Sequence, residues 1–276
     1  KEKLAKNPNF RVVIMSATVD KQKLIEYWTS DEGVEPAVIE SEGAKTLHEI
    51  KRMERPESDT VNEAVLAAID IYKNPQAHGA SNVIQVFEAG KREIKDTIDG
   101  IMSRLPDAVA KKTLVVPNHS ELTRTERIPV YEPFDGIKII VQTNIGKTST
   151  TIPGTRYVIS SGVERTNEID DEDVDGLFEY ESTQDSLIQE EGRGGRTNSS
   201  IFILTKHPGK EYRAFSDRPE YLPAEITRSQ LDRVVMSLAF RGKNARTFNG
   251  SEKVNIVSLE RAIHRLQAIG VLDDAE

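Results

Sequence analysis

Two arginines near residue 195 have the side-chain type and the spacing to bind phosphate. Arg193 and Arg196 belong to the segment 189–196, which reads Gln-Glu-Glu-Gly-Arg-Gly-Gly-Arg, and a spacing of three puts both on one side of a helical turn. An arginine aimed at the γ-phosphate of a nucleoside triphosphate stabilises the charge that builds up there during phosphoryl transfer. Gln189 could order the attacking water, and the glycines keep the backbone slim. On residue types alone, a flexible basic loop or an RNA-contacting segment explains such a string more often than an arginine finger does.

The composition is typical of packed cores under a very polar surface. The chain has 276 residues, of which 37% are hydrophobic and 30% are charged, so a disordered chain is excluded. No apolar run approaches the roughly 18 residues of a membrane span, and the first residues have neither signal-peptide nor transit-peptide features. The lack of cysteine excludes disulfides and thiolate metal sites, and it fits an intracellular protein, cytoplasmic or nuclear.

The net charge of −8 limits how this protein could bind nucleic acid. A protein that binds nucleic acid with its whole surface is expected to be basic. Any such binding must therefore use a local channel of backbone amides, hydroxyls and a few basic side chains.

Short apolar runs alternate with amphipathic helices over roughly the first three quarters of the chain. Helices are predicted from Asp20 to Trp28, from Ser58 or Asp59 to Asn74, and after Gly90. Residues 34–52 are expected to be extended, and a linker is expected at 53–58. The alternation predicts an α/β fold with a parallel sheet and right-handed crossovers. The predicted strands are 10–15, 83–87, 113–116, 137–141, 157–160 and 201–204.

Beyond Pro219 the pattern becomes helical. One helix is predicted over 224–240, and an apolar stripe from Leu259 to Leu266 predicts a second, with Gly270 at its C-cap. These helices suit a small domain of winged-helix type.

The acidic segment 168–181 has two interpretations. It contains eight Asp or Glu residues among 14. A solvated loop is the commoner structure for such a run, and the alternative is a protruding β-hairpin with Gly176 near its turn.

The order of motifs along the chain resembles that of the DEAH/RHA-type superfamily 2 helicases. Residues 142–154, Gln-Thr-Asn-Ile-Gly-Lys-Thr-Ser-Thr-Thr-Ile-Pro-Gly, are similar to the family signature Ala-Thr-Asn-Ile-Ala-Glu-Thr-Ser-Leu-Thr-Ile-Pro-Gly. Residues 189–196 are similar to Gln-Arg-Ala-Gly-Arg-Ala-Gly-Arg. The long first match is the specific one. Further resemblances, all in the correct order, lie at 16–18, 86–94, 119–122, 131–133 and 223–228.

The resemblance implies a role for each matching residue. Arg193 and Arg196 would contact the ATP phosphates, with Gly192 beside them. Gln189 would hold the hydrolytic water, and Tyr131 would stack on the adenine, although Tyr131 suits a core position equally well. The residues that would couple two motor domains are Ser16, Ala17 and Thr18. The residues that would lie near the nucleic-acid backbone are Gly90, Lys91, Ser120, Thr143, Asn144 and Thr148.

The resemblance also implies an architecture, a RecA-like parallel sheet flanked by helices and followed by a small helical winged-helix-like domain. Residues 1–52 would end a first RecA-like motor domain, 53–215 would form the second, and 216–276 would form the winged-helix-like domain. The sequence lacks both the phosphate-binding Gly-x-x-x-x-Gly-Lys-[Ser/Thr] loop and the Asp-Glu-x-His motif. Both would precede Lys1, in a missing N-terminal motor domain. The intact protein would use ATP and Mg²⁺, with no metal site in this chain, and the fragment alone would be inactive.

The partner implied by the resemblance is single-stranded or partly duplex nucleic acid, with RNA favoured over DNA. Backbone amides and hydroxyls suit a strand that is held by its phosphates without base readout. Without the family context, Thr143 and Asn144 are more often strand-end caps than ligands. The acidic segment 168–181 would be a hairpin at the duplex junction, where its repulsion of phosphate suits a wedge or a guide. The source could be cellular or viral.

Several residues depart from the family motifs. Glu190 stands where the family has arginine, and Lys147 stands where it has glutamate, so a Glu190–Lys147 pair would compensate both reversals. These two residues also motivate the alternative function, a catalytically degenerate helicase-like binding or scaffold module. Gly146 and Gly194 replace alanines, which is expected to be sterically mild, and Gln142 replaces a third alanine.

Overall fold

The structure is a computed structural model that describes residues 7, 9–15, 20–29, 35–40, 48–79, 81–147, 151–169 and 174–273. Two compact units divide the chain. The larger unit comprises 43–167 and 176–222, and the smaller unit comprises 1–42, 168–175 and 223–276. All the predicted catalytic, adenine-binding and nucleic-acid residues belong to the larger unit.

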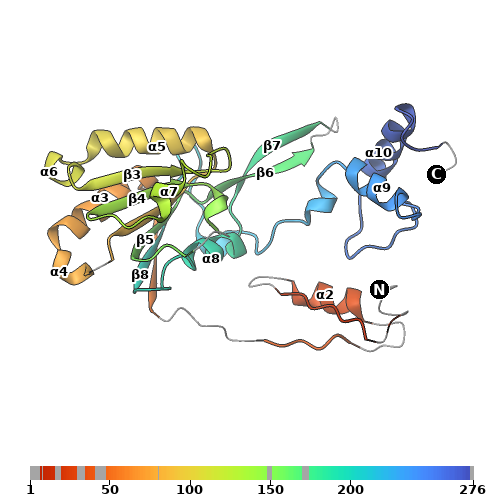
Figure 1. The fold of residues 1–276 in the computed structure, drawn as a ribbon, viewed down its shortest axis with the longest axis horizontal. Coiled ribbons are helices and arrows are strands. Elements are labelled where there is room, and N and C mark those ends of the chain that lie inside the picture. Colours follow the sequence, from red (N-terminus) through yellow and green to blue (C-terminus); the bar gives the residue numbers. More distant parts are fainter. Residues whose placement is uncertain are drawn as a thin grey trace. The chain divides into compact units, whose positions relative to one another are not determined.

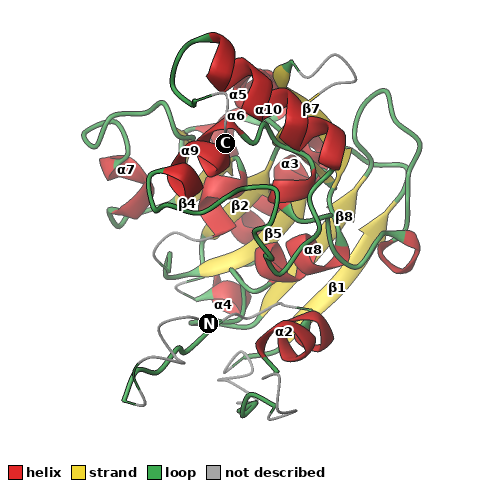
Figure 2. Cartoon of the chain, turned by 90° about the vertical axis from the view of Figure 1, so that its right-hand side faces the viewer, coloured by secondary structure: helices red, strands yellow, loops and turns green. Residues whose placement is uncertain are grey.

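Six parallel strands in the described part of the chain form the sheet of the larger unit (Figure 1). They are β1 Ile50–Arg55, β2 Val83–Phe87, β3 Thr113–Asn118, β4 Ile137–Gln142, β5 Thr155–Ser160 and β8 Ser200–Thr205. Their order is β1-β8-β5-β2-β4-β3, and every neighbouring pair is parallel. Figure 2 shows β1 and β8 side by side at one edge. All residues of β2 and β4 are buried, as expected of central strands covered on both faces. The predicted parallel α/β fold is confirmed.

Helices cover both faces of this sheet. Those of the larger unit are α3 Thr60–Lys73, α4 Pro75–His78, α5 Lys91–Arg104, α6 Asp107–Ala110, α7 Ile128–Tyr131, α8 Gln184–Glu191 and the 3-10 helices η1 Asn144–Lys147 and η2 Phe215–Asp217. Ile84 of β2 lies in a core that α3 and α5 share. Its neighbour Val83 packs with Val130 of α7, and Phe87 packs with Leu187 of α8. Because side chains alternate along a strand, α3 and α5 cover one face, and α7 and α8 cover the other.

Asp59 starts helix α3, as the sequence predicts. Its carboxylate accepts a hydrogen bond from the Asn62 backbone N–H at 2.7 Å, which satisfies one of the donors that a helix start leaves unpaired. Asn74 and Pro75 end the helix, because proline disfavours helical geometry in the residue before it.

The N-terminal residues depart from two predictions. The strand predicted at 10–15 is not formed, and Val13 and Met15 are 76% and 87% exposed. A β-branched apolar run becomes a buried strand only when other strands pair with it, and none does among the described residues. The linker predicted at 53–58 is wrong, because β1 includes 53–55 and pairs with β8. Charged side chains are compatible with such an edge strand. The predicted helix after Asp20 is confirmed as α2 Lys21–Trp28.

The acidic segment contributes to a β-hairpin. Strands β6 (Val163–Ile169) and β7 (Asp175–Glu181) form a separate two-stranded sheet, visible in Figure 1. The hairpin interpretation is therefore confirmed, and the solvated-loop interpretation is wrong. Gly176 lies within β7 and not at the turn, and residues 170–173 lie outside the described part of the chain.

The smaller unit contains the packed helices α9 (Asp232–Ala239) and α10 (Ile256–Ala268). Gly270 follows α10 with a φ of 72°, which fits the predicted C-cap. No helix in the described residues is both long enough and apolar enough to cross a membrane. The core of the two helices contains the predicted stripes, Leu231, Val235, Leu259, Ala262, Ile263 and Leu266.

The single helix predicted over 224–240 is wrong. A 3-10 turn, η3 (Glu225–Thr227), precedes α9, and residues 228–231 are not helical. The Thr227 hydroxyl and the Thr227 N–H both donate to the Ala224 carbonyl. Such local bonds compete with the hydrogen bonds of a continuing helix.

Replacing Asp59 by alanine tests the cap of α3. We expect Asp59→Ala to lower the free energy of unfolding by about 0.5–2 kcal/mol, as measured by urea denaturation. Asp59→Asn keeps the acceptor oxygen and is the matched control, so it should lose much less. Equal losses in both variants would mean that the charge of Asp59, which lies 4.0 Å from Arg104, matters more than the cap.

Candidate nucleotide and nucleic-acid site

Most residues predicted to contact nucleic acid lie at one edge of the sheet. Strands β2, β4 and β3 are parallel neighbours, so the segments that follow them share the carboxyl edge. The Thr143 N–H donates to the Asn118 carbonyl at 3.2 Å, which joins two of these segments. Thr148 lies outside the described residues. The residues that follow β2, β3 and β4 at this edge are Gly90, Lys91, Ser120, Thr143 and Asn144.

Arg165 of β6 lies at this edge as well, although no sequence motif singled it out. A Cβ atom added at Gly90 would lie 2.3 Å from Arg165 Nη1, so the guanidinium approaches where only glycine leaves room. Glu93 of α5 pairs with Arg165 at 2.8 Å, and Glu179 of β7 pairs with it at 3.3 Å. The hairpin is thereby fastened to the start of α5. These partners are far apart in sequence, so no local pattern marks Arg165.

A buried chain of polar side chains runs across the sheet. The Asn118 amide donates to Gln142 Oε1 at 3.0 Å. The Gln142 amide donates to Gln85 Oε1 at 2.9 Å, and the Gln85 amide donates to the Thr155 hydroxyl at 2.7 Å. All four side chains are buried, so each depends on these partners. Gln142, which replaces a family alanine, is the central link.

The glycines at 146 and 194 are required by their neighbours. A Cβ atom at Gly146 would lie 2.3 Å from Gln142 Oε1, and one at Gly194 would lie 2.1 Å from Ser200 Oγ. The expectation that these changes are sterically mild is wrong, because both glycines face buried side chains. Gln142 and Gly146 therefore form a compensating pair, in which one alanine position has gained volume and the other has lost it.

A double-mutant cycle tests this compensation. Gly146→Ala should lower the free energy of unfolding by about 1–3 kcal/mol, because the new methyl group displaces the hydrogen-bonded Gln142 amide. Gln142→Ala should cost less in the Gly146→Ala background than in the wild type, with a coupling energy of about 1 kcal/mol or more. Additive effects in denaturation experiments would contradict the pairing.

The arginine segment, residues 192–196, lies beyond the end of α8. Helix α8 ends at Glu191, and Arg193 and Arg196 lie in the turns that follow. The prediction that they share one helical turn is therefore wrong. Glycine disfavours a helix, and Gly195 adopts a φ of 60°, which does not continue one.

Neutral oxygens accept hydrogen bonds from both guanidinium groups. Arg196 Nε donates to the Gly192 carbonyl at 2.9 Å, and Arg196 Nη1 donates to the Thr151 hydroxyl at 2.8 Å. Arg193 Nε donates to the Gln189 carbonyl at 3.4 Å. Burial and, second to it, the charge of Arg196 lower the pKa of Arg193 to about 10. A half-buried guanidinium group beside a second cation is suited to bind an anion.

The arginine segment lies at the opposite edge of the sheet from the predicted nucleic-acid residues. Thr151 precedes β5, Arg196 precedes β8, and these strands are parallel neighbours. The bond between Arg196 and Thr151 therefore forms at the amino edge. Arg196 is therefore separated from the predicted nucleic-acid residues by the length of the strands, whereas Glu190 of the same motif contacts Lys147 after β4.

Tyr131 is an exposed residue beside a surface hollow. Its side chain is 41% exposed, which argues against the core interpretation. The hollow has a volume of about 600 Å³, and Arg124, Arg127 and Tyr131 are among its lining residues. Arg127 also donates to the carbonyl of Ser120 at 2.9 Å, which ties the hollow to the carboxyl edge. A flat aromatic ring at an open site of this size can stack on a base.

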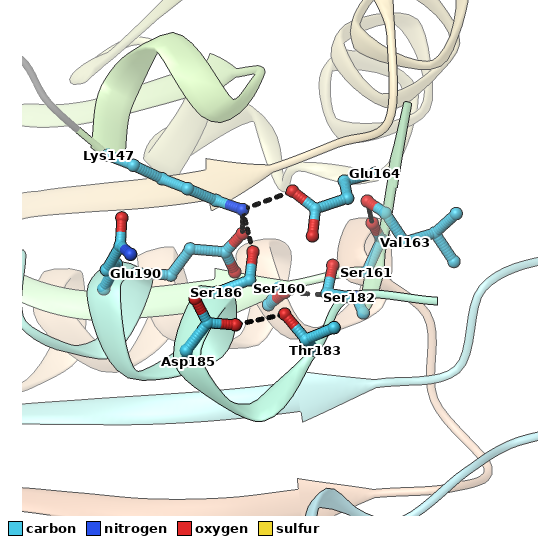
Figure 3. A network of polar contacts seen from close by, with 12 residues as sticks. Lys147, Ser160, Ser161, Val163, Glu164, Ser182, Thr183, Asp185, Ser186 and Glu190 are labelled. Carbon is cyan, nitrogen blue, oxygen red and sulfur yellow. Dashed lines mark hydrogen bonds and ion pairs between the residues drawn. The ribbon is translucent and has the colours of Figure 1, made fainter. Parts of the chain in front are cut away.

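Lys147 and Glu190 form the pair that the sequence predicts. Lys147 Nζ lies 3.2 Å from Glu190 Oε1 and 2.8 Å from Glu164 Oε2 (Figure 3). All three residues are buried. Burial alone would lower the pKa of Lys147, but Glu190 and Glu164 together raise it. Burial raises the pKa of Glu190 against the attraction of Lys147.

Glu88 is a buried carboxyl group directly after β2. Its Oε1 atom accepts hydrogen bonds from the Thr60 hydroxyl at 2.5 Å and from the Thr97 hydroxyl at 2.8 Å. Burial raises the pKa of Glu88 to about 7, although these hydroxyls favour the charged form. The sequence shows a glutamate in the 86–94 motif, but its burial depends on α3 and α5, which supply the two threonines.

The raised pKa of Glu88 predicts a pH-dependent stability. Between about pH 4.5 and 7 the folded protein holds a proton that the unfolded chain has released, so stability falls as the pH rises through this window. Glu88→Gln stays neutral and keeps an oxygen acceptor. We expect it to be more stable than the wild type at pH 8 by up to about 3 kcal/mol, with little difference at pH 4. Parallel curves of melting temperature against pH for the two proteins would contradict the shift.

The remaining predicted residues lie beyond what the structure describes. Ser16, Ala17 and Thr18 are outside the described residues, so their coupling role stays a prediction. Within the described ranges, no group of three or more His, Asp or Glu side chains could hold a metal ion.

Comparison with known proteins gives consistent matches. Residues 67–198 match the family described as helicase conserved C-terminal domain. The ATP-dependent RNA helicase HrpA of Escherichia coli (strain K12) is 28% identical over 247 residues, which is 88% of this chain and 18% of that protein. The ATP-dependent RNA helicase DHX33 of Mus musculus is 28% identical over 99% of this chain and 38% of its own length. The pre-mRNA-splicing factor ATP-dependent RNA helicase prp22 of Schizosaccharomyces pombe (strain 972 / ATCC 24843) is 27% identical over 98% of this chain and 22% of its own length.

The fold has a counterpart among solved structures. The crystal structure of the Escherichia coli DEAH/RHA helicase HrpB aligns with a TM-score of 0.71 at 24% identity, over 94% of this chain and 32% of that one. The chain thus spans well under half the length of these relatives.

Proposed function

We propose, since the chain belongs to the DEAH/RHA-type helicases, that its larger unit is the second motor domain of an ATP-dependent RNA helicase. The residues before β1 would end the first motor domain, and α9 and α10 would begin a winged-helix domain. The chain contains no phosphate-binding loop, so ATP and Mg²⁺ would be held mainly by another part of the intact protein. This unit would close the ATP site from the far side.

The observation that carries the proposal is the pair of neighbouring cations after α8. Arg196 bonds to two neutral oxygens, and burial, followed by the charge of Arg196, lowers the pKa of Arg193. A γ-phosphate between the two guanidinium groups would relieve their repulsion, and the relief grows as negative charge builds up in the transition state.

The other ATP contacts are proposed from their positions in the family motifs. Gln189 lies one helical turn before Arg193, from which it could orient the hydrolytic water. Gly192 leaves space beside the phosphates, and Tyr131 offers an exposed ring for the adenine.

The carboxyl edge is the proposed nucleic-acid surface. Gly90, Lys91, Ser120, Thr143 and Asn144 offer amides, a hydroxyl and one cation to a sugar-phosphate backbone, as a motor that moves without base readout requires. Thr148 is proposed there from its sequence position alone. RNA is the proposed substrate because the relatives above are described as RNA helicases. A site of action in the nucleus or cytoplasm agrees with the splicing factor among them.

The alternative, a degenerate scaffold, is the weaker proposal. It was motivated by the charges of Glu190 and Lys147 beside the arginine segment. The two residues pair with each other at 3.2 Å, so each reversed charge has a partner of opposite sign. The two reversals therefore give no reason to expect a motor without ATPase activity.

Arginine substitution in the full-length protein tests the proposed function. We expect Arg196→Ala to lower kcat for RNA-stimulated ATP hydrolysis by about 10³-fold or more, with Arg193→Ala close behind, because each would remove charge from the transition state. The matched control is Arg104→Ala, which removes an exposed guanidinium at the end of α5 and should leave kcat unchanged. An active full-length protein that tolerates Arg196→Ala would refute the finger role. A full-length wild type without ATPase activity would favour the scaffold.

A further inference from the structure

Lys147 joins three elements that are far apart in the sequence. It ends η1, which follows β4. Its ammonium group contacts Glu164 at the start of hairpin strand β6 and Glu190 in the last turn of α8. The Ser186 hydroxyl of α8 also lies within hydrogen-bond distance of Lys147 Nζ. Figure 3 shows the lysine reaching between the two carboxylates.

Lys147 pairs directly with both carboxylates of this buried cluster, and the buried Arg218 also interacts electrostatically with Glu190. Lys147, Glu164 and Glu190 are only 6%, 8% and 3% exposed, so water does little to screen them. One ammonium group faces two carboxylates, and within the described residues Glu164 Oε1 and Glu190 Oε2 have no hydrogen-bond partner. Buried ion pairs contribute little net stability compared with apolar packing. Their best-attested use is to fix one arrangement of the elements that they join.

The joined elements are those whose relative position matters for the proposed motor. Lys147 lies four residues after Thr143, in the segment that follows β4 at the carboxyl edge. Glu190 lies three residues before Arg193, and Glu164 is adjacent to Arg165 at Gly90. A shift of η1 would therefore pull on the end of α8 and on the base of the hairpin together.

We propose that Lys147 is a positioning residue that, with Glu164 and Glu190, transmits nucleic-acid occupancy of the carboxyl edge and the hairpin to Arg193 and Arg196. The inference rests on the proposed function and deepens it by naming the connection. Its polarity is opposite to that of the family signature, which has glutamate at 147 and arginine at 190. The two reversed positions pair with each other in this chain, which suits a contact that opposite charges can form in either direction.

Charge exchange in the full-length protein tests this connection. Lys147→Glu and Glu190→Arg should each lower the RNA stimulation of kcat by about tenfold or more, a common size for coupling between sites. The Michaelis constant for ATP should change little, because Lys147 is buried and is not among the proposed ATP contacts. The double variant Lys147→Glu/Glu190→Arg keeps one cation and two carboxylates, and it should regain most of the stimulation. Lys95→Glu reverses a lysine in the exposed pair with Asp99, and as a control it should have no effect.

A second variant tests the hairpin arm separately. Glu164→Gln removes the charge of the hairpin carboxylate and leaves the Lys147–Glu190 pair, so it should fold about as well as the wild type. We expect it to lower RNA stimulation, and unchanged stimulation would remove Glu164 from the connection. A double-exchange protein that does not fold, or that folds without regaining stimulation beyond the single variants, would overturn the proposal. A wild type that hydrolyses no ATP would instead count against the proposed function itself.

Discussion

Burial of the Lys147 ammonium group is the constraint on which the arrangement of the candidate site depends. A charge that is removed from water must find partners of opposite sign, and here they come from β6 and α8. The end of α8 is therefore tied to the segment after β4. Arg52 of β1 adds a second tie, because its guanidinium bonds to the Glu191 carboxylate. The arginine segment thus begins from a helix end that is held on two sides.

The parallel sheet explains why two sets of functional residues can be separate and still connected. Loops after its strands carry the proposed nucleic-acid contacts, and the segments before β5 and β8 carry Thr151 and the arginines. The buried chain through Gln142 and Gln85 crosses strands in between. Central strands covered on both faces leave little freedom for such side chains. A displacement at one edge of the sheet is therefore transmitted to the other edge through these hydrogen bonds.

Local patterns in the sequence were sufficient for most of the sheet and its helices. The apolar run of β2 and the Asp59 cap of α3 depend only on neighbouring residues, and both were predicted. The exposed residues 10–15 and the edge strand β1 were not, because a strand exists only through its partners. In the same way, Glu164 and Arg165 could not be foreseen, since their partners lie on η1, α5 and β7. The Lys147–Glu190 pair was foreseeable only because two reversals of charge were visible against one family pattern.

The central claim is that this tie holds Arg193 and Arg196 against the phosphates of ATP. Its most direct test is an experimental structure of the full-length protein with ADP–aluminium fluoride, Mg²⁺ and single-stranded RNA. The claim predicts that both guanidinium groups lie within about 3 Å of the fluoride or β-phosphate oxygens, with Lys147 still contacting Glu190. Nucleotide bound with both arginines turned away, or with the Lys147–Glu190 contact broken, would contradict it.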